Sequence, residues 1–219
     1  MSRFGARDAA RPGRVRIIGG RLRNSRLLVP ELDGLRPTPE RARETLFNWL
    51  APFIAGACAL DLCAGTGALG IEALSRGAAS VTFVERDTRV AQALRDNLER
   101  LQAGEAEVSV GAAQDFLRGS ARRFDLVFLD PPFAPGLWSD LACALETGGW
   151  LTASALVYVE SPRDGVPLLP DAWRIHREGF SGAVRFALYR RQAAASVKLA
   201  SATHSASGTG LAPPARDMP

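Results

Sequence analysis

Beyond Ala57 the sequence alternates between short apolar segments and longer amphipathic segments. This alternation is typical of βαβ units, in which parallel strands form a sheet and helices cover its faces. The expected strands are CALDLC, SVTFVER, EVSV, FDLVFLD and ALVYVES, and the expected helices lie in AGTGALGIEALSRG, in DTRVAQALRDNLERLQ and near residues 114–118 and 137–145. Two further segments, WRIHREGF and AVRFALYRR, are expected to pair antiparallel and close the sheet. The sequence therefore predicts an α/β fold with a mostly parallel sheet.

The chain of 219 residues is long enough for one such domain with an appendage. Both ends mix small residues, proline and arginine without any period, which is typical of disordered segments. The expected division is a disordered basic N-terminus (1–13), a basic hairpin and helix (14–51), the α/β domain (52–192) and a disordered tail (193–219).

The segment before the α/β domain carries much of the positive charge. Residues 1–45 contain eleven arginines against five acidic residues, whereas the whole chain has a net charge of +4. Within this segment VRII, the pair Gly19-Gly20 and RLRNSRLLV indicate a β-hairpin with a glycine turn. Clustered positive charge suits a nucleic-acid backbone. A general preference for arginine stays open as an alternative, because Lys198 is the only lysine.

A helix of about residues 39–51 is expected after the hairpin, with Thr38 as its cap. Its apolar residues recur at three- and four-residue spacings, which leaves Arg41, Arg43 and Glu44 toward the sides or the solvent. The candidate nucleic-acid-binding residues of the hairpin and the helix start are Arg16, Arg21, Arg23, Arg26, Arg36 and Thr38.

Composition argues against several other classes of protein. No stretch offers the roughly 18 apolar residues that a membrane helix needs, and the basic N-terminus lacks a secretory signal, so a cytoplasmic protein is expected. Three cysteines without CxxC spacing favour buried thiols over a disulfide or zinc site. His176 and His204 stand alone, so no metal centre is expected.

A glycine-rich turn lies where an apolar strand becomes a helix. Gly65, Gly67 and Gly70 match GxGxxG, and glycines at such a turn let a ligand approach the backbone near a helix N-terminus. Glu85 ends the next strand, where a carboxylate accepts hydrogen bonds from ribose hydroxyls. This pattern serves a dinucleotide and S-adenosylmethionine equally well.

Asp61 precedes the glycine turn and shifts this balance toward S-adenosylmethionine. A carboxylate there can accept hydrogen bonds from the methionine ammonium, a group that dinucleotides lack. A capping role for the same side chain stays open as an alternative. The expected cofactor is therefore S-adenosylmethionine, with S-adenosylhomocysteine as product and without a metal ion.

The tetrad Asp130-Pro131-Pro132-Phe133 follows the apolar strand FDLVFL. The carboxyl ends of parallel strands share one edge of a sheet, so this loop and the glycine turn are expected to line the same cleft. Two prolines hold the backbone rigid, which fixes the direction of the carboxylate and the carbonyls. These four residues are the candidate catalytic residues.

Rigid acceptors suit the exocyclic amine of a nucleobase, whose lone pair is delocalised into the ring. If Asp130 and the Pro131 carbonyl accept its two protons, the nitrogen gains tetrahedral character and turns its lone pair toward a methyl donor. Phe133 is expected to stack on the base. The simpler alternative is an Asp-Pro turn that ends a strand, with Phe133 in the core.

Taken in order, these segments resemble the family of bacterial 16S ribosomal RNA guanine-N2 methyltransferases of the RsmD type, which modify the small subunit at position 966. The resemblance spans about residues 14–191 and rests on RVRIIGGRLRNSRLLVP, LRPTPERARETLFNWL, DLCAGTGALGIEALSRGA, VERD and FDLVFLDPPF. It implies a Rossmann-like class I S-adenosylmethionine-dependent methyltransferase fold, with a seven-stranded, mostly parallel sheet behind the N-terminal hairpin and helix. It also implies 16S ribosomal RNA, in the small subunit or an assembly intermediate, as partner.

By this resemblance, Asp61, Gly65 and Gly67 surround the methionine part of the cofactor and Glu85 the ribose. The full set of candidate cofactor-binding residues is Asp61, Cys63, Ala64, Gly65, Thr66, Gly67, Glu85, Arg86 and Ala113. Similar proteins often carry a polar residue for the adenine after the fourth strand, where this chain has Gly111-Ala112-Ala113. Adenine recognition is therefore expected to use either backbone amides or a shifted side chain, with Asp115 as a candidate.

Other functions remain as alternatives. An adenine-N6 methyltransferase acting on DNA or RNA would use Asp-Pro-Pro-Phe by the same physics, although the short basic arm argues against sequence-specific DNA binding. A binding module or a dinucleotide oxidoreductase would leave that tetrad unexplained. A monomer is expected, because no long apolar stripe lies outside the inferred core.

Overall fold

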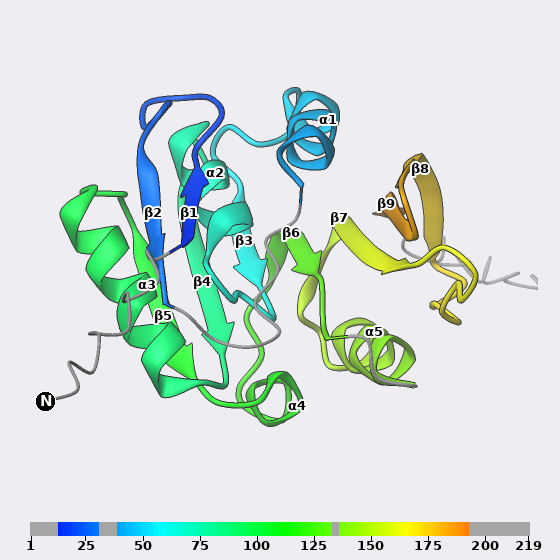
Figure 1. Cartoon of the computed structure of the whole chain (residues 1–219). Coiled ribbons are helices and arrows are strands. Elements are labelled where there is room, and N and C mark those ends of the chain that lie inside the picture. Colours follow the sequence, from blue (N-terminus) through cyan, green and yellow to red (C-terminus); the bar gives the residue numbers. More distant parts are fainter. Residues whose placement is uncertain (1–12, 31–38, 133–135, 193–219) are drawn as a thin grey trace, which may run out of the picture.

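A computed structural model describes residues 13–30, 39–132 and 136–192 of the chain. Its centre is a seven-stranded sheet with the strand order β5-β4-β3-β6-β7-β9-β8, and a separate hairpin of β1 and β2 precedes it (Figure 1). The strands are β1 (Gly13–Arg16), β2 (Arg26–Val29), β3 (Cys58–Asp61), β4 (Ser80–Glu85), β5 (Ala106–Val110), β6 (Phe124–Leu129), β7 (Leu151–Pro162), β8 (Trp173–Ser181) and β9 (Val184–Arg191). The helices are α1 (Glu40–Leu50), α2 (Ala68–Ser75), α3 (Thr88–Arg100), α4 (Ala113–Phe116) and α5 (Leu137–Thr147).

The order of the strands fixes where a ligand can bind. Strands β3 to β7 pair parallel, and β9 pairs antiparallel with both β7 and β8. The chain runs outward from β3 through β4 to β5 and then returns to place β6 on the other side of β3. In an open α/β sheet, ligands bind at the carboxyl edge beside such a reversal. The reversal lies between β3 and β6.

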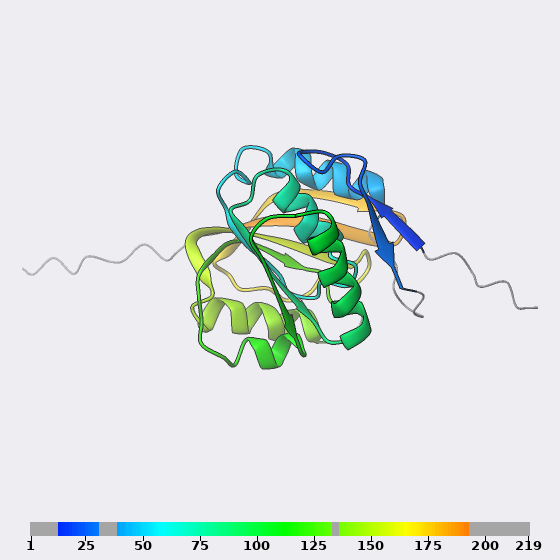
Figure 2. The ribbon, with the colours of Figure 1, turned by 90° about the vertical axis from the view of Figure 1, so that its left-hand side faces the viewer.

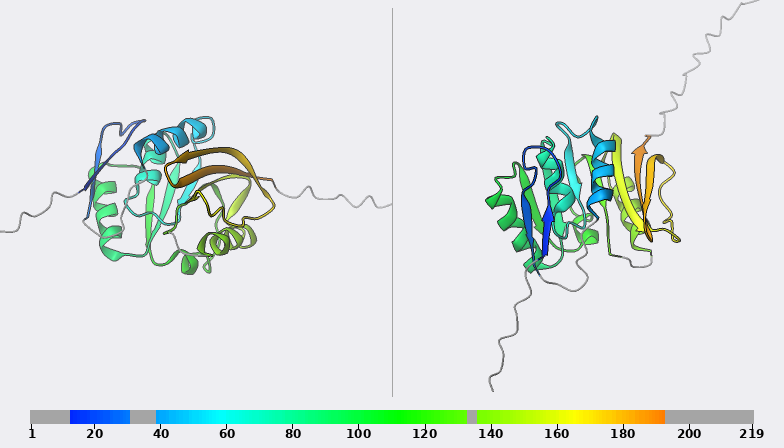
Figure 3. Two further views of the ribbon diagram at one scale, coloured as in Figure 1. Left: turned by 45° about the vertical axis from the view of Figure 1, so that its right-hand side comes forward. Right: turned by 45° about the horizontal axis from the view of Figure 1, so that its top comes forward.

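Helices cover both faces of the sheet with separate hydrophobic clusters. One cluster joins the hairpin, α1 and α2 to the sheet, and the other joins α4 and α5 to the opposite face. The left view of Figure 3 shows α1 and α5 on opposite sides of the sheet. The expected α/β fold with its mostly parallel sheet and closing antiparallel pair is confirmed.

Helix α1 confirms the expected helix but corrects the position of one residue. Leu46 and Leu50 are buried as the apolar spacing predicts. Arg43, which was expected near solvent, is only 2% exposed. Its guanidinium donates from Nη2 to the backbone oxygen of Arg16 at 3.0 Å, and Nη1 lies 3.9 Å from Oε2 of the fully buried Glu72. A carboxylate on α2 therefore holds an arginine inside the molecule.

The hairpin exists, but the expected two-glycine turn is wrong. Gly13 to Arg16 pair with Val29 to Arg26, and residues 17–25 form the connection. Gly20 adopts a φ of +73°, and a side chain there would collide with the backbone of Ser75. The glycine is needed because the loop packs against the end of α2 rather than because it forms the turn.

The hairpin is fixed to α2 and α3 by buried polar groups. Glu72 accepts hydrogen bonds from the backbone N–H groups of Ile18 at 2.7 Å and Gly19 at 2.8 Å. On α3, the side chain of the buried Asn97 accepts from the N–H of Leu28 at 3.0 Å and donates to the carbonyl of Leu28 at 2.9 Å. Asn97 thus bonds to both backbone groups of this residue, as a residue of a neighbouring strand would. Figures 1 and 2 show the hairpin on this side of the molecule. The basic segment and the sheet thus share one core.

Some of the sequence predictions concern residues outside the described ranges, and another one is contradicted by the structure. Arg36 and Thr38 lie outside the described residues, as do the two ends that were expected to be disordered, apart from Gly13, which begins β1. The expectation of three buried thiols is wrong for Cys143, which is exposed on α5, and Cys58 and Cys63 are only partly buried. In the parts of the chain that the structure describes, no helix has both the length and the apolar character to cross a membrane.

Candidate active site

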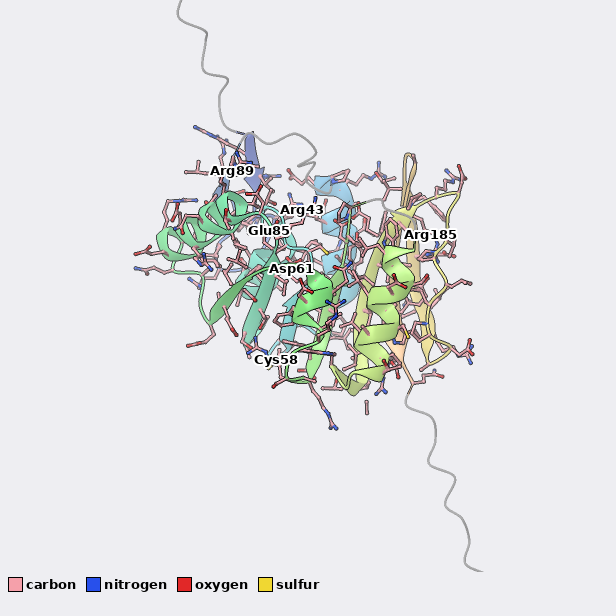
Figure 4. The ribbon with its side chains drawn as sticks, turned by 90° about the horizontal axis from the view of Figure 1, so that it is seen from below. Arg43, Cys58, Asp61, Glu85, Arg89 and Arg185 are labelled. Atoms are coloured by element: carbon pink, nitrogen blue, oxygen red, sulfur yellow. The ribbon has the colours of Figure 1, made fainter. Side chains whose placement is uncertain are left out.

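The predicted cofactor and catalytic residues meet at the carboxyl edge of the sheet. Asp61 ends β3, Glu85 ends β4 and Asp130 follows β6, and these three strands are neighbours. Figure 4 views this edge from below and shows Asp61 and Glu85 near its middle. The sequence prediction that the glycine turn and the Asp-Pro-Pro loop share one edge is confirmed.

Each glycine of the turn serves a different steric purpose. Gly65 has a φ of +50°, and a side chain there would meet nothing within 4 Å, so the backbone is open on this side. Gly67 has a φ of +73° and lies against Leu94, and Gly70 lies against the ring of Phe83. Gly65 therefore leaves room for a ligand, whereas Gly67 and Gly70 permit close packing of α2 on α3 and β4.

Asp61 is buried beneath this turn. Its side-chain oxygen Oδ2 accepts a hydrogen bond from the backbone N–H of Gly70 at 3.0 Å. This contact near the start of α2 supports the capping role that the sequence left open for Asp61. Burial raises the pKa of Asp61 from 3.8 to about 7, and the nearby Glu85 carboxylate adds to this rise while the Gly70 bond opposes it. A cation beside Asp61 would favour its charged form.

Glu85 is held in a fixed direction by two backbone donors. Its Oε2 accepts from the N–H of Gly65 at 2.8 Å, and its Oε1 accepts from the N–H of Asp87 at 2.8 Å. Asp87 in turn caps α3 by accepting from Arg89 and Val90. A carboxylate has about four lone-pair sites, so Glu85 retains acceptor capacity toward hydroxyl groups.

Carboxylates dominate the electrostatics of this edge. Cys63 follows β3, and burial raises the pKa of its thiol to about 12, with further contributions from the carboxylates of Asp61, Asp130 and Glu85. These three negative groups therefore act on one small region, and a cationic ligand suits it. Asp130 is partly exposed, Pro131 is buried and Pro132 is exposed, whereas Phe133 lies outside the described residues.

The remaining candidate residues differ in their accessibility. Ala64 and Thr66 are buried in the turn, Arg86 is exposed after β4, and Ala113 is buried at the start of α4. Within the described residues, no group of three or more His, Cys, Asp or Glu could hold a metal ion.

The four candidate arginines that the structure describes in the basic hairpin, Arg16, Arg21, Arg23 and Arg26, are all exposed, but they do not lie together. Arg16 and Arg26 face each other across the strand pair. Arg21 donates from its backbone N–H to Ser75 at the end of α2 and from its guanidinium to Gln102, just beyond α3. Because α2 begins at the glycine turn and ends at Ser75, Arg21 lies at the far end of the hairpin from the site.

Sequence reasoning missed a second buried carboxylate at this edge. Glu160 lies near the end of β7 and is 7% exposed. Its Oε2 accepts the hydroxyl of Tyr158 at 2.9 Å, and its backbone oxygen accepts the indole N–H of Trp138 at 2.7 Å. An acid at the end of the apolar segment ALVYVES was the available signal, the same one that marks Glu85 and Asp130.

A depression of about 260 Å³ lies at the opposite, amino edge of the sheet. Its lining includes Phe53, Asp125, Ser154 and Arg190, and none of the predicted cofactor or catalytic residues. The candidate site is nevertheless placed at the carboxyl edge, because the open glycine, the carboxylates and the strand reversal coincide there.

Together, the strand order, the glycine turn after β3 and the acid at the end of β4 define a Rossmann-like class I methyltransferase of the kind that uses S-adenosylmethionine. Residues 15–190 match the family described as conserved hypothetical protein 95. The chain belongs to this family and, within it, to the ribosomal RNA small subunit methyltransferase D proteins. The expected family is thereby confirmed.

The similarity to individual relatives extends over most of the chain. Ribosomal RNA small subunit methyltransferase D of Escherichia coli is 50% identical over 182 residues, which cover 83% of this chain and 92% of the relative. The protein of the same name from Haemophilus influenzae is 44% identical, with 81% and 94% covered. The solved structure of a candidate methyltransferase of Escherichia coli, yhhF, superposes with a TM-score of 0.78 at 50% identity, covering 83% of this chain and 100% of that one.

Proposed function

We propose that this protein transfers a methyl group from S-adenosylmethionine to the exocyclic N2 of a guanine in 16S ribosomal RNA, at the position numbered 966. The observation that carries the proposal is the place of Asp130, directly after β6 and beside the glycine turn after β3. Relatives that are 50% and 44% identical are named for methylation of small-subunit ribosomal RNA. We propose the small subunit or an assembly intermediate as partner, the cytoplasm as location and a monomer as the active form.

S-adenosylmethionine suits the residues at this edge, and when bound it supplies a methyl group on a positively charged sulfur. Gly65 offers an open backbone against which the methionine part fits. Asp61 accepts from the ammonium group, and Glu85 accepts from the ribose hydroxyls while Gly65 and Asp87 hold it in place. The carboxylates around Cys63 favour the cationic cofactor over its neutral thioether product.

Asp130 and the carbonyl of Pro131 act on the guanine amine. They accept its two protons, which draws the nitrogen lone pair out of the ring and points it at the methyl group. The N–C bond forms as the S–C bond breaks, sulfur keeps the electron pair, and one proton leaves the nitrogen to solvent afterwards. No strong base is required, and Phe133 is proposed to stack on the base.

The decisive test is methyl transfer to small ribosomal subunits that lack the modification. Radiolabelled S-adenosylmethionine, purified protein and such subunits are incubated, and the labelled nucleoside is identified by mass spectrometry. N2-methylguanosine is the expected product. N6-methyladenosine, or label appearing only in DNA, would retain the chemistry and refute the proposed substrate.

Cofactor affinity is expected to depend on pH through Asp61. Its pKa of about 7 in the unliganded protein means that binding the ammonium group must first remove a proton at lower pH. The Kd should therefore rise by about fivefold from pH 7 to pH 6. Calorimetry checks this, and Asp61→Asn should bind weakly with a flat profile between these pH values. A wild-type Kd that is equal at pH 6 and pH 7.5 would contradict the assignment.

The same shift has a consequence for the stability of the unliganded protein. The unfolded chain releases the Asp61 proton near pH 3.8, whereas the folded protein keeps it up to about pH 7. Between these values the folded state binds more protons, so this group's contribution to stability falls as the pH rises from about 4 to 7. The variant Asp61→Asn has no titrating group at this position, so this pH dependence of the stability should be absent from it.

The basic hairpin is expected to contact RNA phosphates. Replacing Arg21, Arg23 and Arg26 together with alanine should weaken subunit binding and reduce the slope of log K against log salt, by about 0.7 for each phosphate that the variant no longer neutralises. Filter binding between about 50 and 200 mM salt measures this slope.

The matched control replaces Arg163, Arg174 and Arg177, which are exposed in or beside β8 at the other edge of the sheet. This control variant removes the same charge as the hairpin variant, but it should reduce the slope of log K against log salt by less. Equal slopes for the two triple variants would show that only net charge, and not the hairpin, is involved.

A further inference from the structure

Glu160 and Asp130 occupy adjacent positions on neighbouring strands. β6 and β7 are parallel, and their last paired residues are Leu129 and Val159. The next residue on each chain is therefore Asp130 on one side and Glu160 on the other. Neighbouring strands lie about 4.8 Å apart, so the two residues lie side by side, Asp130 just beyond the end of β6 and Glu160 still within β7.

The two carboxylates also share one face of the sheet. Phe128 pairs with Tyr158 in the register, and their rings meet edge to face with centroids 6.3 Å apart. Asp130, just beyond the end of β6, and Glu160, within β7, each follow two residues later along the chain, and residues two apart in extended backbone project to the same face. Consistent with this, burial and the charges of Glu160 and Asp130 hold the pKa of Tyr158 well above its ordinary value.

Glu160 is 7% exposed, and a carboxylate that is so far buried has to be hydrogen-bonded or ion-paired in the folded protein. Tyr158 donates its hydroxyl to Glu160 at 2.9 Å, which fixes the direction of the carboxylate. A carboxylate has about four lone-pair sites, so its two oxygens can accept several donors at once. Glu160 can therefore accept a further donor from a ligand held at Asp130.

We propose that Glu160 determines specificity for guanine by accepting the N1–H of the target base while Asp130 accepts from its N2 amine. Guanine presents these two donors next to each other on its Watson–Crick edge. Adenine presents an amine next to an unprotonated N1, whose lone pair would face the Glu160 carboxylate and be repelled. The inference rests on the proposed function and explains why the same Asp-Pro-Pro loop would act on guanine rather than adenine.

The test compares guanine with 2-aminopurine, which keeps the 2-amino group but has an unprotonated N1. Small subunits reconstituted with either base at the target position serve as substrates. The wild-type kcat/KM for 2-aminopurine should be at least about 100-fold lower, because a site built to accept a hydrogen bond rejects an analogue that lacks the donor. Equal rates on both bases would overturn the inference without any variant being needed.

The variant Glu160→Gln tests whether Glu160 causes the preference for guanine over 2-aminopurine. Its amide can donate to the unprotonated N1, so the guanine rate should fall about 10- to 100-fold and the preference over 2-aminopurine should shrink at least about tenfold. Cofactor affinity should stay within about threefold. Glu178→Gln, an exposed change on β8, is the control and should keep the wild-type preference.

The outcomes separate this inference from the proposed function. Formation of N2-methylguanosine by the wild type, together with an unchanged base preference in Glu160→Gln, would refute the role of Glu160 and leave the proposed function intact. Absence of N2-methylguanosine from guanine-containing subunits would refute the proposed function itself.

Discussion

Asp130→Ala is expected to lower the rate of methyl transfer by roughly 100- to 1,000-fold while S-adenosylmethionine binding stays within a few-fold. The alanine side chain removes one of the two acceptors that act on the amine, and the loss of a single preorganised hydrogen-bonding group from a catalytic site commonly has an effect of about this size. In the proposed function, Asp61 and Glu85 at the ends of β3 and β4 make the direct contacts with the cofactor, so its affinity should depend only weakly on the Asp130 side chain. Single-turnover transfer and calorimetry measure the two effects separately.

Two further variants sharpen this experiment. Asp130→Asn keeps one carbonyl acceptor and should retain more activity than Asp130→Ala. Asp140→Ala changes an exposed aspartate on the neighbouring α5 and should leave transfer unchanged. Full activity in Asp130→Ala would remove Asp130 from the mechanism.

Glu72→Ala is expected to destabilise the protein by about 3–5 kcal/mol. The variant leaves the buried guanidinium of Arg43 without its nearby carboxylate and removes the acceptor for the N–H groups of Ile18 and Gly19. Arg76 also loses a bond of 2.7 Å to the same side chain. For a chain of this size the melting temperature should fall by roughly 10 °C, as measured by calorimetry.

A double-mutant cycle identifies the cause of this loss. If the buried charge is responsible, Arg43→Met should cost less in the Glu72→Ala background than in the wild type. Glu99→Ala, an exposed change on α3, is the control and should have little effect. A loss below about 1 kcal/mol for Glu72→Ala would show that the carboxylate does not hold the hairpin in place.

The sequence predicted the features that depend on local pattern. The apolar alternation identified every strand of the central sheet, and the glycine spacing identified the turn after β3. The position of Asp130 followed from one rule, that the carboxyl ends of parallel strands share an edge. These features are encoded in neighbouring residues, so no knowledge of the tertiary structure was needed.

The features that the sequence did not reveal depend on distant partners. Arg43 is buried because Glu72, on another helix, faces it, and the helical spacing of α1 alone cannot show this. Gly20 looked like a turn residue, yet its constraint is the backbone of Ser75. The sequence shows that Glu160 is an acid near the end of an apolar segment, but its place beside Asp130 follows only from the register of β6 and β7.

The place of β9 bears on how the protein acquires its structure during synthesis. β9 is the last strand in the described chain, yet it lies inside the sheet between β7 and β8. Until it is made, β7 has an open edge and β8 has no neighbour in the sheet. Pairings between segments distant along the chain form slowly, and unpaired strand edges favour aggregation. The half of the sheet that carries Glu160 is thus completed only when translation has passed Arg191, so nascent chains stopped earlier should be prone to association and dependent on chaperones.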